Sequence, residues 1–317
     1  MKKILTLFVA SMVVVSMSAC SSVKEKESDT SKPKMQILNI GAINSVDVVP
    51  IVIADQKGYF KKQGLEVRFQ PFKSPSDRDA ALQAGSLDGL ITDEIGICLY
   101  ENGGLDVRIT GITDGNFILV AGADSGIKEV KDVKGKSVAI SEKTSIEYTL
   151  DKILEKNSMS PKDVKKTVVP AIPTRFEMLR NKKVDLALLP EPFATLAIKE
   201  GGIAIASASK LGTYPSVTAF TQKSIDNKSN EIKAFYKAYN ETVNYINSTP
   251  ISEYEDTVIK TVGYPEEMKG KIILPKFRQN ILPTEEGLKA VIDWTTNKGL
   301  VKKVLNPKDL INSIGVN

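Results

Sequence analysis

The sequence contains no histidine among its 317 residues. Imidazole acid/base catalysis, a Ser-His-Asp triad and a histidine-ligated metal are therefore excluded, and we expect no cofactor and no metal. Cysteine is nearly as scarce, because only Cys20 and Cys98 occur. Cys98 lies in the apolar run 95–100, which favours a small buried side chain over a reactive thiol. Once Cys20 is set aside, as argued below, no pair remains to form an internal disulfide.

No apolar run is long enough to cross a bilayer. The run at residues 4–15 follows Lys2 and Lys3 and has the length of a secretory signal. The full chain carries a net charge of +5, and residues 1–19 contain two lysines and no acidic residue, so the remainder carries two charges fewer. A balance this close to neutral predicts no nucleic-acid partner.

The end of the first apolar run reads Met-Ser-Ala-Cys at residues 17–20. Small residues before a cysteine resemble the lipobox of bacterial lipoproteins, with Met17 where that box usually has leucine. The alternative is a simple signal peptide with an incidental cysteine. We expect residues 1–19 to be a lipoprotein signal peptide and Cys20 to be the lipidation site, which places the protein outside the cytoplasm and anchors it to the cell membrane. Residues 20–35 contain too few apolar residues to fold and should form a flexible tether.

Residues 36–211 alternate short β-branched runs with segments of helical period, which indicates an α/β fold with mainly parallel sheets. The expected strands are residues 37–43, 65–69, 89–92, 107–112, 136–140, 166–169, 185–189 and 203–208. After residue 224 the pattern predicts a helical C-terminal tail with helices at 231–247, 252–262 and 285–298.

A weak internal repeat at an offset of 97 residues supports two related lobes. Arg78, Leu82, Asp88 and Glu94 fall on Arg175, Leu179, Asp185 and Glu191 when the chain is shifted by that amount. The same helix, turn, strand and acidic loop therefore recur. Because open α/β sheets bind ligands beyond the carboxyl ends of their strands, two such lobes facing each other would form a cleft.

Four segments carry a family resemblance. They are ADQKGYFKKQGLEV at 54–67, LQAGSLD at 82–88, VKDVKGKSVA at 130–139 and LPEPF at 189–193. In this order and spacing they resemble the aliphatic-sulfonate, nitrate and thiamine-precursor family of solute-binding proteins, strongly from residue 36 to about 220 and weakly beyond.

The resemblance implies a two-lobed periplasmic-binding-protein-like fold of type II. Lobe 1 would comprise residues 36–120 plus 221–317 and lobe 2 residues 121–220, with hinge crossovers near 120–123 and 217–221. It also implies a monomer that binds a small-molecule ligand without chemical change and delivers it to an ABC permease powered by a separate ATPase subunit.

The candidate ligand contacts follow strands or open helices on the expected cleft side, where hydroxyls and backbone N–H groups suit a polar ligand. For most of these residues, the alternative is an ordinary helix cap or a solvated loop. In the first lobe they are Ser45, Val46, Asp47, Ser74, Ser76, Thr92, Asp93 and Glu94. Asn116 at the hinge and, in the second lobe, Ser141, Thr144, Ser145, Thr174, Arg175, Glu191 and Tyr214 complete the set.

These residues do not decide whether the ligand is an anion or a neutral or positively charged compound. Hydroxyl-rich helix starts with Arg175 favour a sulfonate-like anion, whereas Asp93, Glu94 and Glu191 favour a pyrimidine or thiamine-precursor-like compound, because inward carboxylates repel an anion. Two other functions are considered. A binding subunit of a sensory system would look the same, and an enzyme of the thiamine-pyrimidine synthase type is disfavoured because the family implies that it uses histidine and a cysteine-rich motif.

Overall fold

The computed structural model describes residues 36–316. The signal peptide expected at 1–19, the lipidation site Cys20 and the tether expected at 20–35 lie outside these residues. Within residues 36–316, every helix is too short or too polar to span a membrane.

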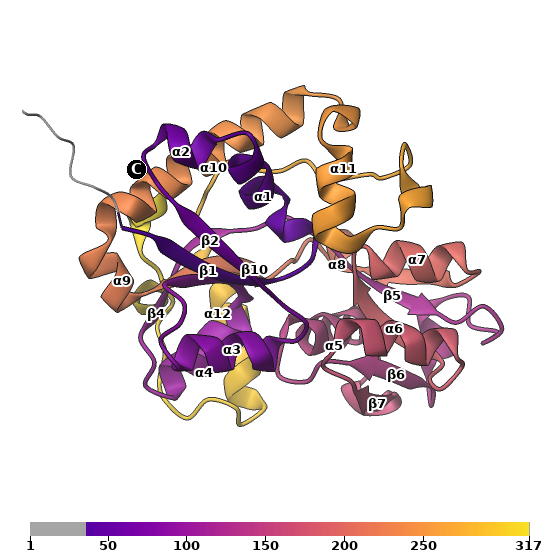
Figure 1. Cartoon of the computed structure of the whole chain (residues 1–317). Helices are drawn as coiled ribbons and strands as arrows, with labels where there is room; N and C mark the ends of the chain where they lie inside the picture. The colour runs from indigo at the N-terminus through magenta and orange to yellow at the C-terminus, as the bar shows by residue number, and fades with distance from the viewer. Residues whose placement is uncertain (1–35, 317) are drawn as a thin grey trace, which may run out of the picture. The chain divides into compact units, whose positions relative to one another are not determined.

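Sheet A contains five strands in the order β2-β1-β3-β10-β4 (Figure 1). Its strands are β1 (Leu38–Ile43), β2 (Val67–Phe72), β3 (Gly89–Asp93), β4 (Val107–Ile112) and β10 (Ser216–Thr221). Strands β1, β2 and β3 pair in parallel, and β10 lies antiparallel between β3 and β4. The sheet is therefore mixed, with β10 as the single reversed strand.

Helices cover both faces of sheet A, which explains why its central strands are apolar on both sides. On one face the core joins β1 to α1 (Val49–Gln56), α2 (Tyr59–Lys62) and α10 (Ser229–Ser248). On the other face it joins β3 and β4 to α3 (Pro75–Gln83), α4 (Glu94–Asn102) and α12 (Glu285–Asn297).

Sheet B repeats this plan in the order β7-β6-β8-β5-β9. Its strands are β5 (Phe117–Ala121), β6 (Ser137–Ile140), β7 (Lys165–Val168), β8 (Leu186–Pro190) and β9 (Ile203–Ser207). Strands β6, β7 and β8 pair in parallel, and β5 is the reversed strand between β8 and β9.

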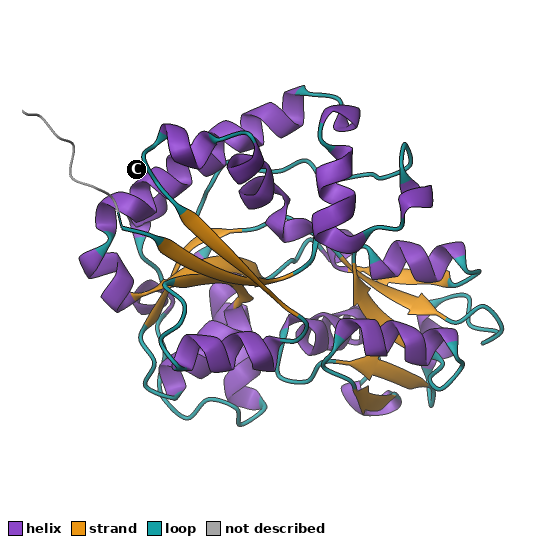
Figure 2. Cartoon of the chain, viewed as in Figure 1, coloured by secondary structure: helices purple, strands orange, loops and turns teal. Residues whose placement is uncertain are grey.

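Sheet B is also sandwiched between helices (Figure 2). One face packs on α5 (Ser145–Lys156) and α8 (Ala208–Leu211), and the other on α6 (Ile172–Arg180) and α7 (Phe193–Lys199). Alternation along β8 produces this division, since Leu186 and Leu188 face α5 while Ala187 and Leu189 face α6 and α7.

The predicted duplication is visible in the element bounds. Helix α3 begins at Pro75 and α6 at Ile172, and strand β3 begins at Gly89 and β8 at Leu186, so both pairs differ by the offset of 97 seen in the sequence. The two sheets also share one strand order and one reversed strand. The two-sheet α/β architecture and the helical tail predicted from the sequence are confirmed. The tail adds the short helix α9 (Gln222–Asn227), and the helix expected at 252–262 is formed as the short α11 (Glu255–Val258) followed by a π-helical turn at Ile259–Gly263.

The structure corrects the hinge crossovers expected near 120–123 and 217–221. Residues 120 and 121 end strand β5 in sheet B, and 217–221 lie within β10 of sheet A. The segments that connect the sheets are instead 113–116 and 212–215. The sequence shows both strands as apolar runs, but it does not show that each inserts antiparallel into the middle of a sheet. We call residues 38–112 with 216–316 half A, and residues 117–211 half B.

Away from the strand ends, the two halves also meet where α12 of half A approaches α5 of half B. The indole Nε1 of Trp294 donates to Asp151 Oδ2 at 3.1 Å. The ammonium group of Lys298 donates to Glu147 Oε1 at 2.5 Å and to Asp151 Oδ2 at 3.0 Å. The rings of Trp294 and Tyr148 pack edge to face with centroids 5.5 Å apart. We call this set the α5–α12 latch.

Candidate functional site

A cavity of about 70 Å³ lies where the carboxyl ends of the parallel strands of both halves meet. This is the position at which open α/β sheets present helix N-termini and loop groups to ligands. Its walls are formed by Ile43, Ser45, Asp47, Pro75, Arg78, Ile91, Thr92, Asp93, Phe117, Ser141, Thr144, Ser145, Ile146, Ile172, Arg175, Pro190, Tyr214 and Ser216. Both halves and one connecting segment therefore contribute to one site.

Asp47 is held by four hydroxyl groups. Its Oδ2 accepts from Ser45 at 2.7 Å and from Tyr214 at 2.8 Å, and its Oδ1 accepts from Thr113 at 2.5 Å and from Ser216 at 3.1 Å. A carboxylate offers about four acceptor positions, so the protein itself satisfies this one. Thr113 and Tyr214 belong to the two connecting segments, and Asp47 therefore fastens both segments to the start of half A.

Two buried arginines occupy equivalent places in the halves. The Nη1 of Arg78 donates to the carbonyl of Ile91 in β3 at 2.9 Å, and the Nη1 of Arg175 donates to the carbonyl of Leu188 in β8 at 2.8 Å. Arg78 also forms an ion pair with Asp79 at 2.7 Å. Although burial opposes the charge of Arg78, the nearby Tyr100 and Asp79 raise its pKa.

Arg175 has no such acid partner among the described residues. Its other hydrogen bonds go to the carbonyls of Val169 at 3.0 Å and Pro170 at 3.2 Å. It is 1% exposed, and burial lowers the pKa of its guanidinium to about 9. The planar fork has five N–H groups, of which these bonds use three, so two remain available. A buried cation without a counter-charge would be stabilised by an anionic group that binds beside it.

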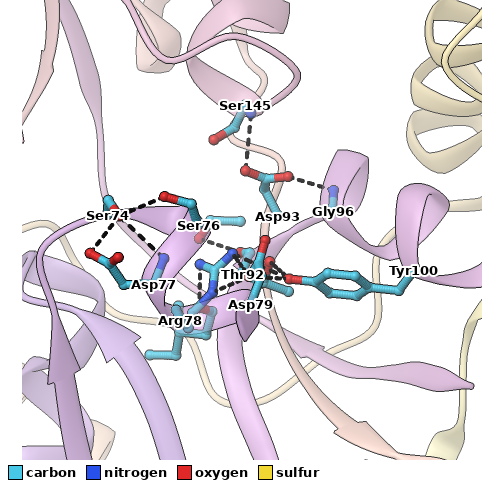
Figure 3. Close-up of polar contacts among 12 residues, drawn as sticks. Ser74, Ser76, Asp77, Arg78, Asp79, Thr92, Asp93, Gly96, Tyr100 and Ser145 are labelled. Carbon is cyan, nitrogen blue, oxygen red and sulfur yellow. Dashed lines mark hydrogen bonds and ion pairs between the residues drawn. The ribbon is translucent and has the colours of Figure 1, made fainter. Parts of the chain in front are cut away.

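Asp93 links the two halves inside the site (Figure 3). Its Oδ1 accepts from the N–H of Gly96 at 2.7 Å, which caps α4, and its Oδ2 accepts from the N–H of Ser145 at 3.0 Å, at the start of α5. The side chain is buried. Burial raises the pKa of its carboxyl, against the opposing effects of the Ser145 N–H and the charge of Arg78.

The half-B wall beside Asp93 is rich in hydroxyls. Thr144 caps α5 by accepting from the N–H of Ile146 at 3.2 Å, and its hydroxyl donates to the carbonyl of Ser141 at 2.9 Å. Ser141 and Ser145 lie on the same wall and are buried. The strand-to-helix turn places these groups at the cavity because a strand end and a helix start meet there.

The structure therefore brings together many of the residues singled out from the sequence. Those that line the cavity are Ser45, Asp47, Thr92, Asp93, Ser141, Thr144, Ser145, Arg175 and Tyr214. Those that do not line it are Val46, Ser74, Ser76, Glu94, Asn116, Thr174 and Glu191. A ligand contact stays a prediction for each of them.

The residues outside the cavity mostly have local partners. Val46 is in the core of half A, and Ser74 caps α3 by accepting from Asp77 N–H at 3.2 Å. Asn116 accepts from Ser209 N–H at 3.0 Å, and Glu191 accepts from Thr195 N–H at 3.0 Å. These are the capping and turn roles that the sequence left open as alternatives.

The other residues outside the cavity differ in burial. Ser76 and Thr174 are exposed on α3 and α6. Glu94 is buried, and burial together with the charge of Asp93 raises the pKa of its carboxyl to about 7.

Sequence reasoning missed several residues of the wall. Arg78 carried a signal, because the offset of 97 pairs it with Arg175. The apolar members Ile43, Ile91 and Phe117 carried none, because an apolar residue at a strand end is as compatible with the core as with a binding site. Ser216 was not selected because it begins strand β10, which the sequence analysis interpreted as a hinge crossover. Among residues 36–316, no group of acidic or cysteine side chains is arranged to hold a metal ion.

Comparison with known proteins gives matches over most of the chain. The family model described as NMT1/THI5 like matches residues 45–253. A Bacillus subtilis (strain 168) protein described as an aliphatic sulfonates-binding protein is 26% identical over 303 residues, covering 88% of this chain and 87% of that protein. The 4-amino-5-hydroxymethyl-2-methylpyrimidine phosphate synthase of Schizosaccharomyces pombe is 29% identical over 118 residues, covering 36% of this chain and 34% of the synthase.

The fold has close counterparts among solved structures. The alkanesulfonate-binding protein SsuA from Xanthomonas axonopodis pv. citri, bound to MOPS, superimposes with a TM-score of 0.73 at 16% identity. The match covers 87% of this chain and 98% of that one. At this identity the likeness establishes the fold.

Proposed function

Because the chain belongs to the NMT1/THI5-like family, whose model matches residues 45–253, we propose that it captures a small polar solute between halves A and B. The solute is bound without chemical change. The cavity supports this reading, since both halves contribute buried polar groups to it and the connecting segments 113–116 and 212–215 are short enough to act as hinges.

The observation that carries the proposal is Arg175, a buried guanidinium at the cavity with carbonyl partners only. Sequestering a cation without a counter-charge is unfavourable, and a ligand that brings a negative group removes that disadvantage. We therefore propose a sulfonate-like or other small organic anion as the ligand class. The sulfonate-binding relative from Bacillus subtilis agrees with this choice. The alternative, a pyrimidine-like compound, would leave Arg175 unpaired.

The hinge proposal follows from the chain path. In this proposal the two lobes are halves A and B, so the lobe boundaries expected at 120/121 and 220/221 move to the connecting segments 113–116 and 212–215. Asp47 accepts hydrogen bonds from hydroxyls of both segments. It would therefore hold the two segments together while the lobes open and close. A ligand that binds the closed form more tightly than the open form drives the closure.

Delivery belongs to the same proposal. We propose that the protein acts outside the cytoplasm as a monomer, tethered through a lipid on Cys20, and hands its ligand to an ABC permease energised by its ATPase subunit. This proposal rests on the lipobox-like segment at 17–20 and on the sulfonate-binding relatives.

An enzymatic role is disfavoured by chemistry as well as by coverage. The pyrimidine synthase matches 36% of this chain, whereas the sulfonate-binding relative matches 88%. The chain has no histidine. Cys98 is buried, and burial raises the pKa of its thiol to about 12, so it is not a thiolate nucleophile at neutral pH.

The test is calorimetric titration of the delipidated protein with two panels, one of alkanesulfonates and one of aminopyrimidines. We expect a sulfonate to bind and Arg175→Met to lose at least tenfold in affinity for it, while Arg180→Met, an exposed arginine on the same helix, binds like the wild type. Binding of a pyrimidine with undiminished affinity by Arg175→Met would contradict the assignment of the ligand class.

A further inference from the structure

Asp93 places a negative charge of the protein itself at the start of α5. Each of its oxygens accepts one backbone N–H, from Gly96 in half A and from Ser145 in half B. The first turn of a helix presents unpaired N–H groups and the positive end of the helix dipole. In α5, which is 12 residues long, the carboxylate of Asp93 already takes the place in which a ligand anion would be favoured.

The charges around Asp93 leave it available to a positive or N–H-bearing group. The guanidinium of Arg78 is near enough to lower the pKa of Asp93, but that cation is bound at 2.7 Å to Asp79. The next residue, Glu94, is also an acid, so it brings no positive charge to Asp93. Each oxygen of Asp93 accepts one backbone bond, and a carboxylate oxygen has two acceptor positions. The hydroxyl of Ser145 also donates to this carboxylate, so three of its about four acceptor positions are used and about one is open to a ligand donor.

The opposite situation holds at Arg175. That cation has hydrogen bonds but no anion among the described residues, and it lines the same cavity. The cavity wall thus contains one group, Arg175, that favours a negative ligand group beside it and another, Asp93, that disfavours one. Asp93 would repel an anionic group beside it substantially, because the site is buried and poorly screened.

We propose that Asp93 is a specificity-determining residue, which admits an ammonium or N–H group next to the start of α5 and excludes a second anionic group there. The inference rests on the proposed function, because it assumes a solute bound between the halves with its anionic group at Arg175. It adds that the preferred solutes carry a nitrogen donor as well as the anionic group.

The test uses matched probes that differ only by an amine. These are the unbranched alkanesulfonates of two, three and four carbons, each with and without a terminal amino group. The proteins are the wild type, Asp93→Asn and Asp93→Ser, and the measurement is calorimetric titration. Asparagine and serine both cap helices well, so the two variants keep the cap of α4 without the charge. The control is Asp132→Asn, which removes a carboxylate that also accepts two backbone N–H groups but lies outside the cavity.

The wild type and Asp132→Asn should bind the amino member of at least one pair tenfold or more tightly than its plain partner. Both Asp93 variants should lose that preference and bind the plain alkanesulfonate more tightly than the wild type does. The inference is overturned if the wild type binds the plain members equally well or better in every pair, or if the Asp93 variants keep the wild-type order.

The titrations distinguish a wrong role for Asp93 from a wrong ligand class. If the wild type binds plain alkanesulfonates without an amine preference, the inference about Asp93 fails and the proposed function stands. If none of the proteins binds any of the six sulfonates, both the ligand class and the role of Asp93 are wrong.

Discussion

The α5–α12 latch should contribute directly to the affinity for the ligand. Replacing Lys298 by methionine keeps the length of the side chain but removes the cation that bridges Glu147 and Asp151. The side chains of Lys298, Glu147 and Asp151 are 28%, 10% and 1% exposed, so solvent screens the interaction only in part. Lys166 remains as the other cation on both acids.

The expected magnitude follows from the bonds that are lost. A hydrogen bond between charged groups contributes about 1.5–3 kcal/mol, and we assign about 2 kcal/mol to the pair of Lys298 bonds because Lys166 compensates in part. If the latch exists only when the halves are closed, this loss lowers the closed-to-open ratio by about 30-fold, since 1.4 kcal/mol corresponds to a factor of ten. Calorimetric titration should then show up to about 30-fold weaker binding of the ligand.

Lys289→Met is the matched control. Lys289 lies on the same helix and pairs with Asp293, but these side chains are 65% and 54% exposed, and the pair does not reach half B. Its removal should leave the affinity unchanged, as expected for an exposed i,i+4 pair. Equal affinities of Lys298→Met and Lys289→Met would refute the role of the latch.

Three further predictions follow from the buried polar groups. Because the pKa of Glu94 is raised to about 7, the folded protein binds a proton more readily than the unfolded chain between pH 4.5 and 7, so stability falls as the pH rises through that window. Glu94→Gln should therefore be more stable than the wild type at pH 8 by up to about 3 kcal/mol in urea unfolding, since one pKa unit corresponds to about 1.4 kcal/mol, and equal stability at pH 8 would count against this. Asp47→Asn leaves hydroxyl donors without an acceptor and should lower the stability by about 2–4 kcal/mol; an unchanged urea midpoint would contradict the fastening role. Trp294 is the only tryptophan and bonds to Asp151 across the halves, so ligand binding should change its fluorescence, and an Asp151→Asn variant should show a smaller change.

The fold could be predicted from the sequence where local pattern and packing agree. Strand β4 was predicted at its observed bounds, since β-branched apolar residues alternate along it and turn residues lie on either side. Strands β5 and β10 were taken for linkers instead. Their pairing partners are distant in sequence, as in the pairing of Val217 with Thr92, and no local signal indicates that a run inserts antiparallel between distant strands.

The site was predictable where the chemistry of helix starts applies. Thr144 and Ser145 were found because a strand end that leads into a helix start presents hydroxyl and N–H groups on the cleft side. The same reasoning also selected Glu191, which lies just before α7 and accepts the N–H of Thr195 in the first turn of that helix. An acid at a helix start can bond to the helix or to the ligand, and the sequence does not specify which way the side chain turns.

Closure of the two halves around the solute can be measured by small-angle X-ray scattering of the purified protein with and without a bound sulfonate. We expect the ligand-bound scattering to match the arrangement described here, with Asp93 in contact with the start of α5, and the ligand-free protein to include a more extended form with a larger radius of gyration. Identical scattering curves in both states, obtained with a ligand that calorimetry shows to be bound, would contradict closure of the two halves around the solute.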